Sequence, residues 1–86
     1  MTLKIHKGNI LKTMTGCIEI MRFNGSIVDV NETYIDIDDE NEIFKTVDRR
    51  YTLNEIAALL HDYDGLNYRV IWDALPDGAS LKNEEV

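Results

Sequence analysis

The sequence predicts an α+β domain: an antiparallel β-meander of four to five strands, with one amphipathic helix packed on one face and a final C-terminal strand. Three observations predict it. Short segments rich in β-branched residues, separated by turn residues, fill positions 17–47. A helix-start signal at Thr52 precedes apolar residues spaced three and four apart. An apolar run at 66–72 then follows the helix and reads as the last strand.

Residues 17–22 and 26–30 form the first predicted hairpin. A two-residue Asn-Gly loop would mix apolar and acidic side chains on each face of this hairpin. A three-residue loop at 23–25, with Gly25 in the left-handed conformation, instead gives one aliphatic face. We therefore expect the second register, whose cross-strand pairs are Ile18 with Val30 and Ile20 with Val28.

Residues 33–38 alternate strictly between polar and apolar side chains and predict a third strand. The alternation places Ile35 and Ile37 inside the protein. The polar members of the strand are expected outside, namely Tyr34, Asp36 and Asp38. A polar turn at 39–41 and a fourth strand at 42–47 complete the meander.

Thr52 and Glu55 have the spacing of a capping box, so a helix is expected to begin at Leu53 and to end at Asp64-Gly65. Its apolar stripe consists of Leu53, Ile56, Leu59, Leu60 and Tyr63. We expect residues 1–75 to form a single α+β domain, whose first dozen residues hold a short strand, a turn and the start of another strand. Residues 76–86 are expected to form a polar, flexible C-terminal tail.

The composition is typical of one small intracellular domain. Hydrophobic residues make up 44% of the 86 positions and charged residues 29%, which is an ordinary globular mixture. The N-terminal residues lack the apolar region of a signal peptide, and no stretch approaches the roughly 20 apolar residues of a membrane span. The single cysteine, Cys17, cannot form an internal disulfide, so we expect a cytoplasmic protein.

Acidic residues outnumber basic residues by 16 to 9, which gives a net charge of −7. They are concentrated between positions 29 and 42, where seven acids and no base occur. Such a segment repels phosphate and attracts basic surfaces. Its acids are Asp29, Glu32, Asp36, Asp38, Asp39, Glu40 and Glu42.

No pattern in the sequence predicts catalysis, a cofactor or a metal site. A calcium-binding loop that starts at Asp36 would need glycine where Asn41 stands and glutamate where Val47 stands. The two histidines lie far apart and match no zinc-ligand spacing. Cys17 lies in a predicted strand, where a lone cysteine is usually a small buried side chain. Phosphate-binding loops and nucleophile elbows are also absent from the sequence, so we expect a protein that is not an enzyme.

The leading hypothesis is a small acidic binding protein. Asp36 and Asp38 would hold their carboxylates about 6.6–6.8 Å apart on one strand face. Such a surface fits a groove whose Lys and Arg side chains serve nucleic acid. By analogy with phage or plasmid counter-defence proteins, we expect an inhibitor or regulator that docks on the basic surface of a partner protein. The expected partner-binding residues are Asp29, Glu32, Tyr34, Asp36, Asp38, Asp39, Glu40 and Glu42.

Two alternatives use other surfaces. The first is a homo-oligomerising structural or interaction module, for example a homodimer. Its contact surface would be the second sheet face around Met21 and Ile27, together with Tyr34, Tyr68 and Trp72. The second is a small β-sheet nucleic-acid-binding protein that uses Lys4, Lys7, Lys12 and Arg22, although four bases beside a net charge of −7 disfavour it. The acids also have a plain interpretation, which is that they keep one sheet face hydrated.

Overall fold

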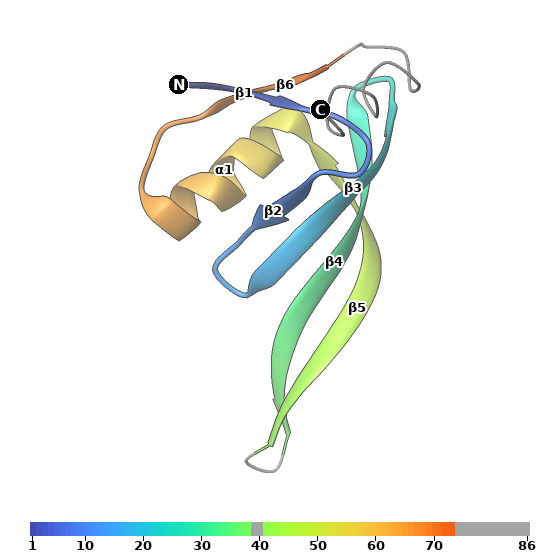
Figure 1. Cartoon of the computed structure of the whole chain (residues 1–86), viewed down its shortest axis with the longest axis vertical. Coiled ribbons are helices and arrows are strands. Elements are labelled where there is room, and N and C mark those ends of the chain that lie inside the picture. The colour runs from blue at the N-terminus through green and yellow to red at the C-terminus, as the bar shows by residue number, and fades with distance from the viewer. Residues whose placement is uncertain (39–40, 74–86) are drawn as a thin grey trace, which may run out of the picture.

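The computed structural model describes residues 1–38 and 41–73 and confirms the α+β class (Figure 1). Four antiparallel strands form one sheet in the order β2-β3-β4-β5, and two parallel strands, β1 and β6, form a second. The helix follows the four-stranded sheet in the chain. In chain order the elements are β1 (Thr2–Ile5), β2 (Ile10–Lys12), β3 (Gly16–Asn24), β4 (Ile27–Asp38), β5 (Asn41–Thr52), α1 (Leu53–Asp64) and β6 (Arg69–Trp72).

The hydrophobic core lies between α1 and one face of the four-stranded sheet. Strands β3 and β4 contribute alternate residues to it, because every second side chain of a strand points to the same face. The β1–β6 pair adds one residue from each strand. At the edge of the core the ring of Phe23 stacks on Trp72, with 5.1 Å between the ring centroids. The buried members are Ile5, Ile18, Ile20, Val28, Val30, Ile56, Leu60 and Val70.

The helix begins and ends where the sequence predicts. The Thr52 hydroxyl accepts a hydrogen bond from the backbone N–H of Glu55, and the Glu55 carboxylate accepts one from the backbone N–H of Thr52. Gly65 ends the helix in the left-handed conformation, with φ of 73°. One member of the predicted apolar stripe is wrong, since Tyr63 is 46% exposed.

The β3–β4 hairpin differs from the predicted register by three residues next to the loop and by two residues beyond the bulge. Gly25 has the expected left-handed φ, but the loop consists of Gly25 and Ser26 because Asn24 pairs with Ile27. Farther along, a bulge at Met21 adds one residue to β3. The bulge turns Met21 and Arg22 together to the outer face, and the aliphatic residues still share the buried face. The observed pairs are Ile20 with Val30 and Ile18 with Glu32.

Strand β4 is one continuous strand of 12 residues instead of two strands separated by a turn. Its pairing with β5 has no register shift, so the alternation of faces set by Val28 and Val30 continues to the end of the strand. Ile35 and Ile37 therefore lie on the face opposite to the core. The prediction that they point inside is wrong, because Ile35 is 42% exposed and Ile37 is 72% exposed.

The polar residues of the same strand are correspondingly misplaced by the prediction. Tyr34 and Asp36, expected outside, are half-buried and lie on the face that carries the core farther along β4. The side chain of Asp38 lies outside the described residues, as does the whole of residues 39–40.

The chain ends of the described structure come together in the small sheet. Strand β6 begins three residues later than the predicted strand and pairs in parallel with β1. The predicted tail at 76–86 falls outside the described residues. Within residues 1–38 and 41–73, no helix is long and apolar enough to cross a membrane.

Candidate protein-binding surface

Strands β4 and β5 project beyond the rest of the sheet (Figure 1). The pairing of β3 with β4 ends at Gly16 and Tyr34, and the next contact is a hydrogen bond of 3.1 Å from the Ile35 N–H to the Thr15 carbonyl. A Cβ atom at Gly16 would overlap the backbone of Thr33, so glycine permits this close approach of the two strands. We define residues 35–38 of β4 and 41–44 of β5 as the β4–β5 arm.

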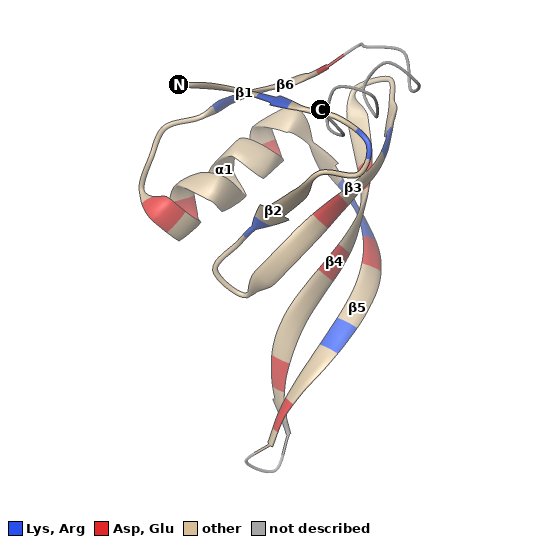
Figure 2. Ribbon diagram, in the orientation of Figure 1, with Lys and Arg blue, Asp and Glu red and all other residues tan. Residues whose placement is uncertain are grey.

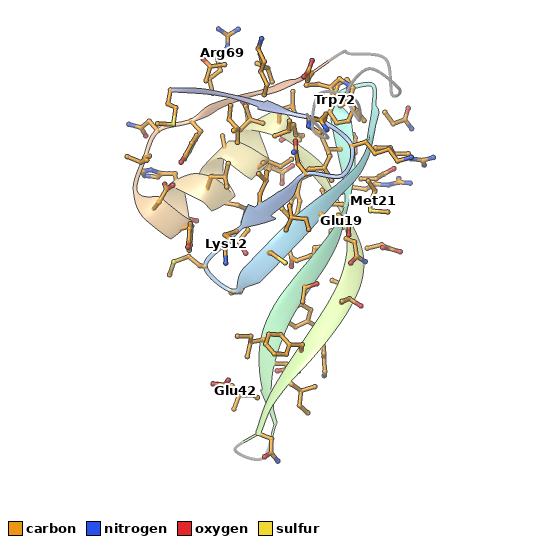
Figure 3. The ribbon with its side chains drawn as sticks, in the orientation of Figure 1. Lys12, Glu19, Met21, Glu42, Arg69 and Trp72 are labelled. Carbon is orange, nitrogen blue, oxygen red and sulfur yellow. The ribbon has the colours of Figure 1, made fainter. Side chains whose placement is uncertain are left out.

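The outer face of the β4–β5 arm, opposite to the core face, carries large apolar side chains. Ile35 lies directly across from Phe44, and Ile37 is the next residue on the same face. Phe44 is 71% exposed, almost as much as Ile37. Glu42, opposite Ile37, lies beside them near the end of the arm (Figure 3). We call Ile35, Ile37 and Phe44 the apolar tip.

The predicted acidic residue Asp29 lies on the same outer face, toward the body of the protein. Its carboxylate accepts hydrogen bonds from Arg22 Nε at 2.7 Å and from Arg50 Nε at 3.1 Å. The hydrogen bond from Arg22 is the main cause that lowers the pKa of Asp29 below its ordinary value of 3.8, and Arg50 adds to it against the opposing effect of burial. This carboxylate is therefore already compensated by two guanidinium groups.

Glu32 and Asp36 face the other side of the sheet and are also paired. Glu32 accepts hydrogen bonds from Arg49 Nε at 3.0 Å and from the Tyr51 hydroxyl at 2.6 Å. Asp36 Oδ2 lies 2.8 Å from Lys45 Nζ, and this hydrogen bond lowers the pKa of Asp36 and raises that of Lys45. Burial, and then the bond to Glu32, raise the pKa of Tyr51 to about 12.

The predicted acidic row is thus divided between the two faces of the sheet. Lys and Arg residues of β5 lie beside the acids of β4 (Figure 2). Asp29 points outward, while Glu32 and Asp36 point to the opposite side with Tyr34. Glu42 is exposed and makes no ion pair with any residue that the structure describes. Asp38 pairs with Asn41 in the ladder, but its side chain, and residues Asp39 and Glu40, are not described.

The residues named for the homo-oligomer alternative differ in their exposure and contacts. Met21 is exposed on the bulge of β3, close to Glu19 (Figure 3). Trp72 is half-buried against Phe23, and the Tyr68 hydroxyl donates a hydrogen bond to Asp64. Phe44 is not among the site residues that the sequence predicts. Its neighbour Ile43 was the available signal, because two adjacent strand residues cannot both point into one core.

The described residues bring together no groups that indicate catalysis or metal binding. No cluster of three or more His, Cys, Asp or Glu side chains occurs among them. Cys17 is half-buried on the outer face, not fully buried as expected. An open depression of about 630 Å³ lies beside the β3 bulge, lined by Met21, Arg22, Asp29, Val30, Asp48, Arg49 and Arg50. Its arginines already bond Asp29 and Glu32, so we assign it no ligand.

Comparisons with protein-family models, with curated proteins and with solved structures found no match for this chain. The site is therefore interpreted from its geometry alone.

Proposed function

We propose that this chain is a non-enzymatic binding protein that docks on another protein through the apolar tip of its β4–β5 arm. The observation that carries the proposal is the exposure of Phe44 and Ile37, at 71% and 72%, on a hairpin that projects from the body. Exposed apolar patches of this kind are typical of interaction sites, because the free energy falls when apolar side chains leave water. A side chain of this size gains about 1.5–3 kcal/mol when it is fully buried.

The surroundings of the apolar tip support recognition of a protein surface. Polar and charged residues border the tip, with Thr33 and Thr46 toward the body and Glu42 beside Ile37. An apolar centre with a polar rim is the usual anatomy of a protein–protein contact. Because the chain has one cysteine and no disulfide partner for it, we expect the partner in a reducing compartment such as the cytoplasm.

A basic partner, the acidic-inhibitor hypothesis, is the second candidate. The net charge of −7 favours it, because a negative protein is attracted to a surface built for nucleic acid, as in the phage and plasmid proteins of the analogy. The ion pairs of Asp29, Glu32 and Asp36 weaken it, since these carboxylates are already compensated within the chain. In this second candidate, exposed acids such as Glu42 would steer the encounter.

The proposal is tested by affinity capture with the double variant Ile37→Ser/Phe44→Ser. The matched control is Ile10→Ser/Met14→Ser, which removes two apolar side chains of similar exposure, 65% and 68%, from outside the arm. We expect a partner bound by the wild type and by the control but lost by the arm variant. Equal capture by all three proteins would show that the arm is not the docking surface, and the variant Glu42→Lys then tests the second candidate.

A further inference from the structure

Among the residues that the structure describes, β5 has no neighbouring strand on the side away from β4. It is the last strand of the four-stranded sheet. In an antiparallel ladder, the N–H and C=O of one residue point to the same neighbouring strand, and the direction alternates along the chain. The Ile35 N–H points toward β3, because it donates to the Thr15 carbonyl. Its partner Phe44 therefore points its N–H and C=O away from β4, as do Glu42 and Thr46 on either side.

Charged side chains are more closely spaced at one end of this edge than at the other. Proteins prevent edge-to-edge pairing by placing charged side chains on their edge strands. On β5 the consecutive charged residues Asp48, Arg49 and Arg50 lie next to the body. In the half nearer the arm tip, Glu42 and Lys45 are the charged residues, and Lys45 is paired with Asp36. The half with the exposed phenylalanine therefore has fewer charges to oppose pairing with another strand.

We propose that the partner is a second copy of this chain, whose β5 pairs antiparallel with the first across a two-fold axis at Phe44. This inference rests on the proposed function and identifies the protein that docks on the β4–β5 arm. In this register Phe44 lies opposite Phe44 of the second copy, Glu42 lies opposite Thr46, and Ile43 lies opposite Lys45. The two four-stranded sheets join into one continuous sheet. Such an interface is isologous, because the same patch is used on both copies.

The two-fold axis could lie at any residue from 42 to 50 of β5, and the charged residues distinguish these positions. A two-fold axis at a charged residue places that residue opposite the same residue of the second copy, which excludes axes at Glu42, Lys45, Asp48, Arg49 and Arg50. An axis at Val47 places Lys45 opposite Arg49 of the second copy. Like charges directly opposite each other are destabilising. Axes at Ile43 or Thr46 avoid this but put a carboxylate, from Glu42 or Asp48, opposite Phe44. The axis at Phe44 has neither defect.

The selected register also joins the apolar side chains around Phe44 of the two copies. Ile35 lies beside Phe44 on the outer face of each copy, so the two copies form a row of four apolar side chains across four strands. Aromatic pairs and pairs between aromatic and β-branched residues stabilise neighbouring strands. The unpaired backbone groups of Phe44 gain partners at the same time. The contact covers a short strand segment, so we expect dimers that dissociate on dilution.

The first test is sedimentation of the purified chain over a range of concentrations, with no other protein present. We expect a dimer population that rises with concentration in the wild type and in Ile10→Ser, and that is lost in Phe44→Ser. Phe44 is largely exposed, so its replacement leaves the core intact, and circular dichroism checks that the variant is folded. A wild-type chain that stays monomeric at every concentration would overturn the proposal.

The second test determines the register by disulfide cross-linking in a Cys17→Ala background. Opposed residues of an antiparallel pair have Cα atoms about 4.5–5.5 Å apart, within the range of a disulfide. We expect a mixture of the Glu42→Cys and Thr46→Cys variants to cross-link much faster than either variant alone. Self-cross-linking of Thr46→Cys at the rate of the mixture would place the axis at Thr46 and contradict the proposed register.

The two proposals fail separately. A chain that is monomeric alone but loses a captured partner in Ile37→Ser/Phe44→Ser would refute the dimer and retain docking through the arm. A chain that neither self-associates nor loses a partner in that variant would refute both.

Discussion

Asp29 shows how one carboxylate can organise three strands. Its two oxygens accept from Arg22 on β3 and from Arg50 on β5, so the ion pairs run across the sheet at right angles to the strands. The β3 bulge makes this possible, because it brings Arg22 directly opposite Asp29. The carboxylate is better stabilised as an anion in the folded chain than in the unfolded chain, as its lowered pKa shows.

The pH dependence of stability follows from this pKa. A carboxyl group with a lowered pKa in the folded state contributes stability above its ordinary value of 3.8, and the contribution is lost as the pH falls through the folded-state value. We therefore expect Asp29→Asn to be less stable than the wild type near neutral pH, with a difference that shrinks below pH 3.8. Urea denaturation at a series of pH values measures this difference. A gap of constant size down to acidic pH would contradict the assignment, and Glu42→Gln is the control at an exposed carboxylate.

At the scale of single elements, α1 depends on signals within a few residues of each end. The capping box satisfies two backbone N–H groups of the first turn, which otherwise have no partner in the helix. The Gly65 N–H donates a hydrogen bond to the His61 carbonyl and closes the last turn. Ile56 and Leu60 then bury one face of the helix against the sheet.

The capping box gives a prediction for this helix. Thr52→Ala removes the side chain that accepts from Glu55 N–H and should lower the free energy of unfolding by about 1 kcal/mol. Thr52→Ser keeps the acceptor and should recover most of that loss. Chemical denaturation of the three proteins tests this, and equal loss in both variants would show that the methyl group of Thr52, not its hydroxyl, provides the stabilisation.

The parts of the fold that were predictable from sequence are those set by residues close together in the chain. The helix bounds, its caps and the left-handed φ of Gly25 depend on neighbours in the chain, and these were predicted correctly. The face of Ile35 depends on whether the strand breaks at Asn31 and Glu32, and that is decided by residues about 17 positions away. Asp48 and Arg49 pair with these two polar residues and keep them in the ladder. No pattern local to Asn31 contains this information.

The acidic site predicted from the sequence and the proposed apolar tip overlap in the chain but differ in their chemistry. The interval 29–42 does contain most of the arm, yet its described acids Asp29, Glu32 and Asp36 are paired with bases, and Ile35 and Ile37 are exposed. One signal was available in advance. Val28 and Val30 occupy even positions and Ile35 and Ile37 odd positions, so in an unbroken strand they cannot share a face.

At the scale of the whole molecule, net charge and apolar surface act in opposite directions on self-association. Each copy carries a net charge of −7, so two copies repel each other at low ionic strength. In the proposed dimer, the contact at Phe44 is apolar and gains nothing from ionic attraction. We therefore expect the dimer dissociation constant to decrease as salt screens the repulsion. Sedimentation at several salt concentrations measures it, whereas a dimer that weakens with salt would indicate an interface held by ion pairs.

The parallel pairing of β1 with β6 places the N-terminus at the end of the molecule far from the β4–β5 arm (Figure 1). The terminal amine of Met1 donates to the Asn67 carbonyl at 3.4 Å, close to the start of β6. An affinity handle or fluorophore fused before Met1 therefore hangs from the opposite pole. A chain immobilised by that handle presents the β4–β5 arm to the solution, away from the support.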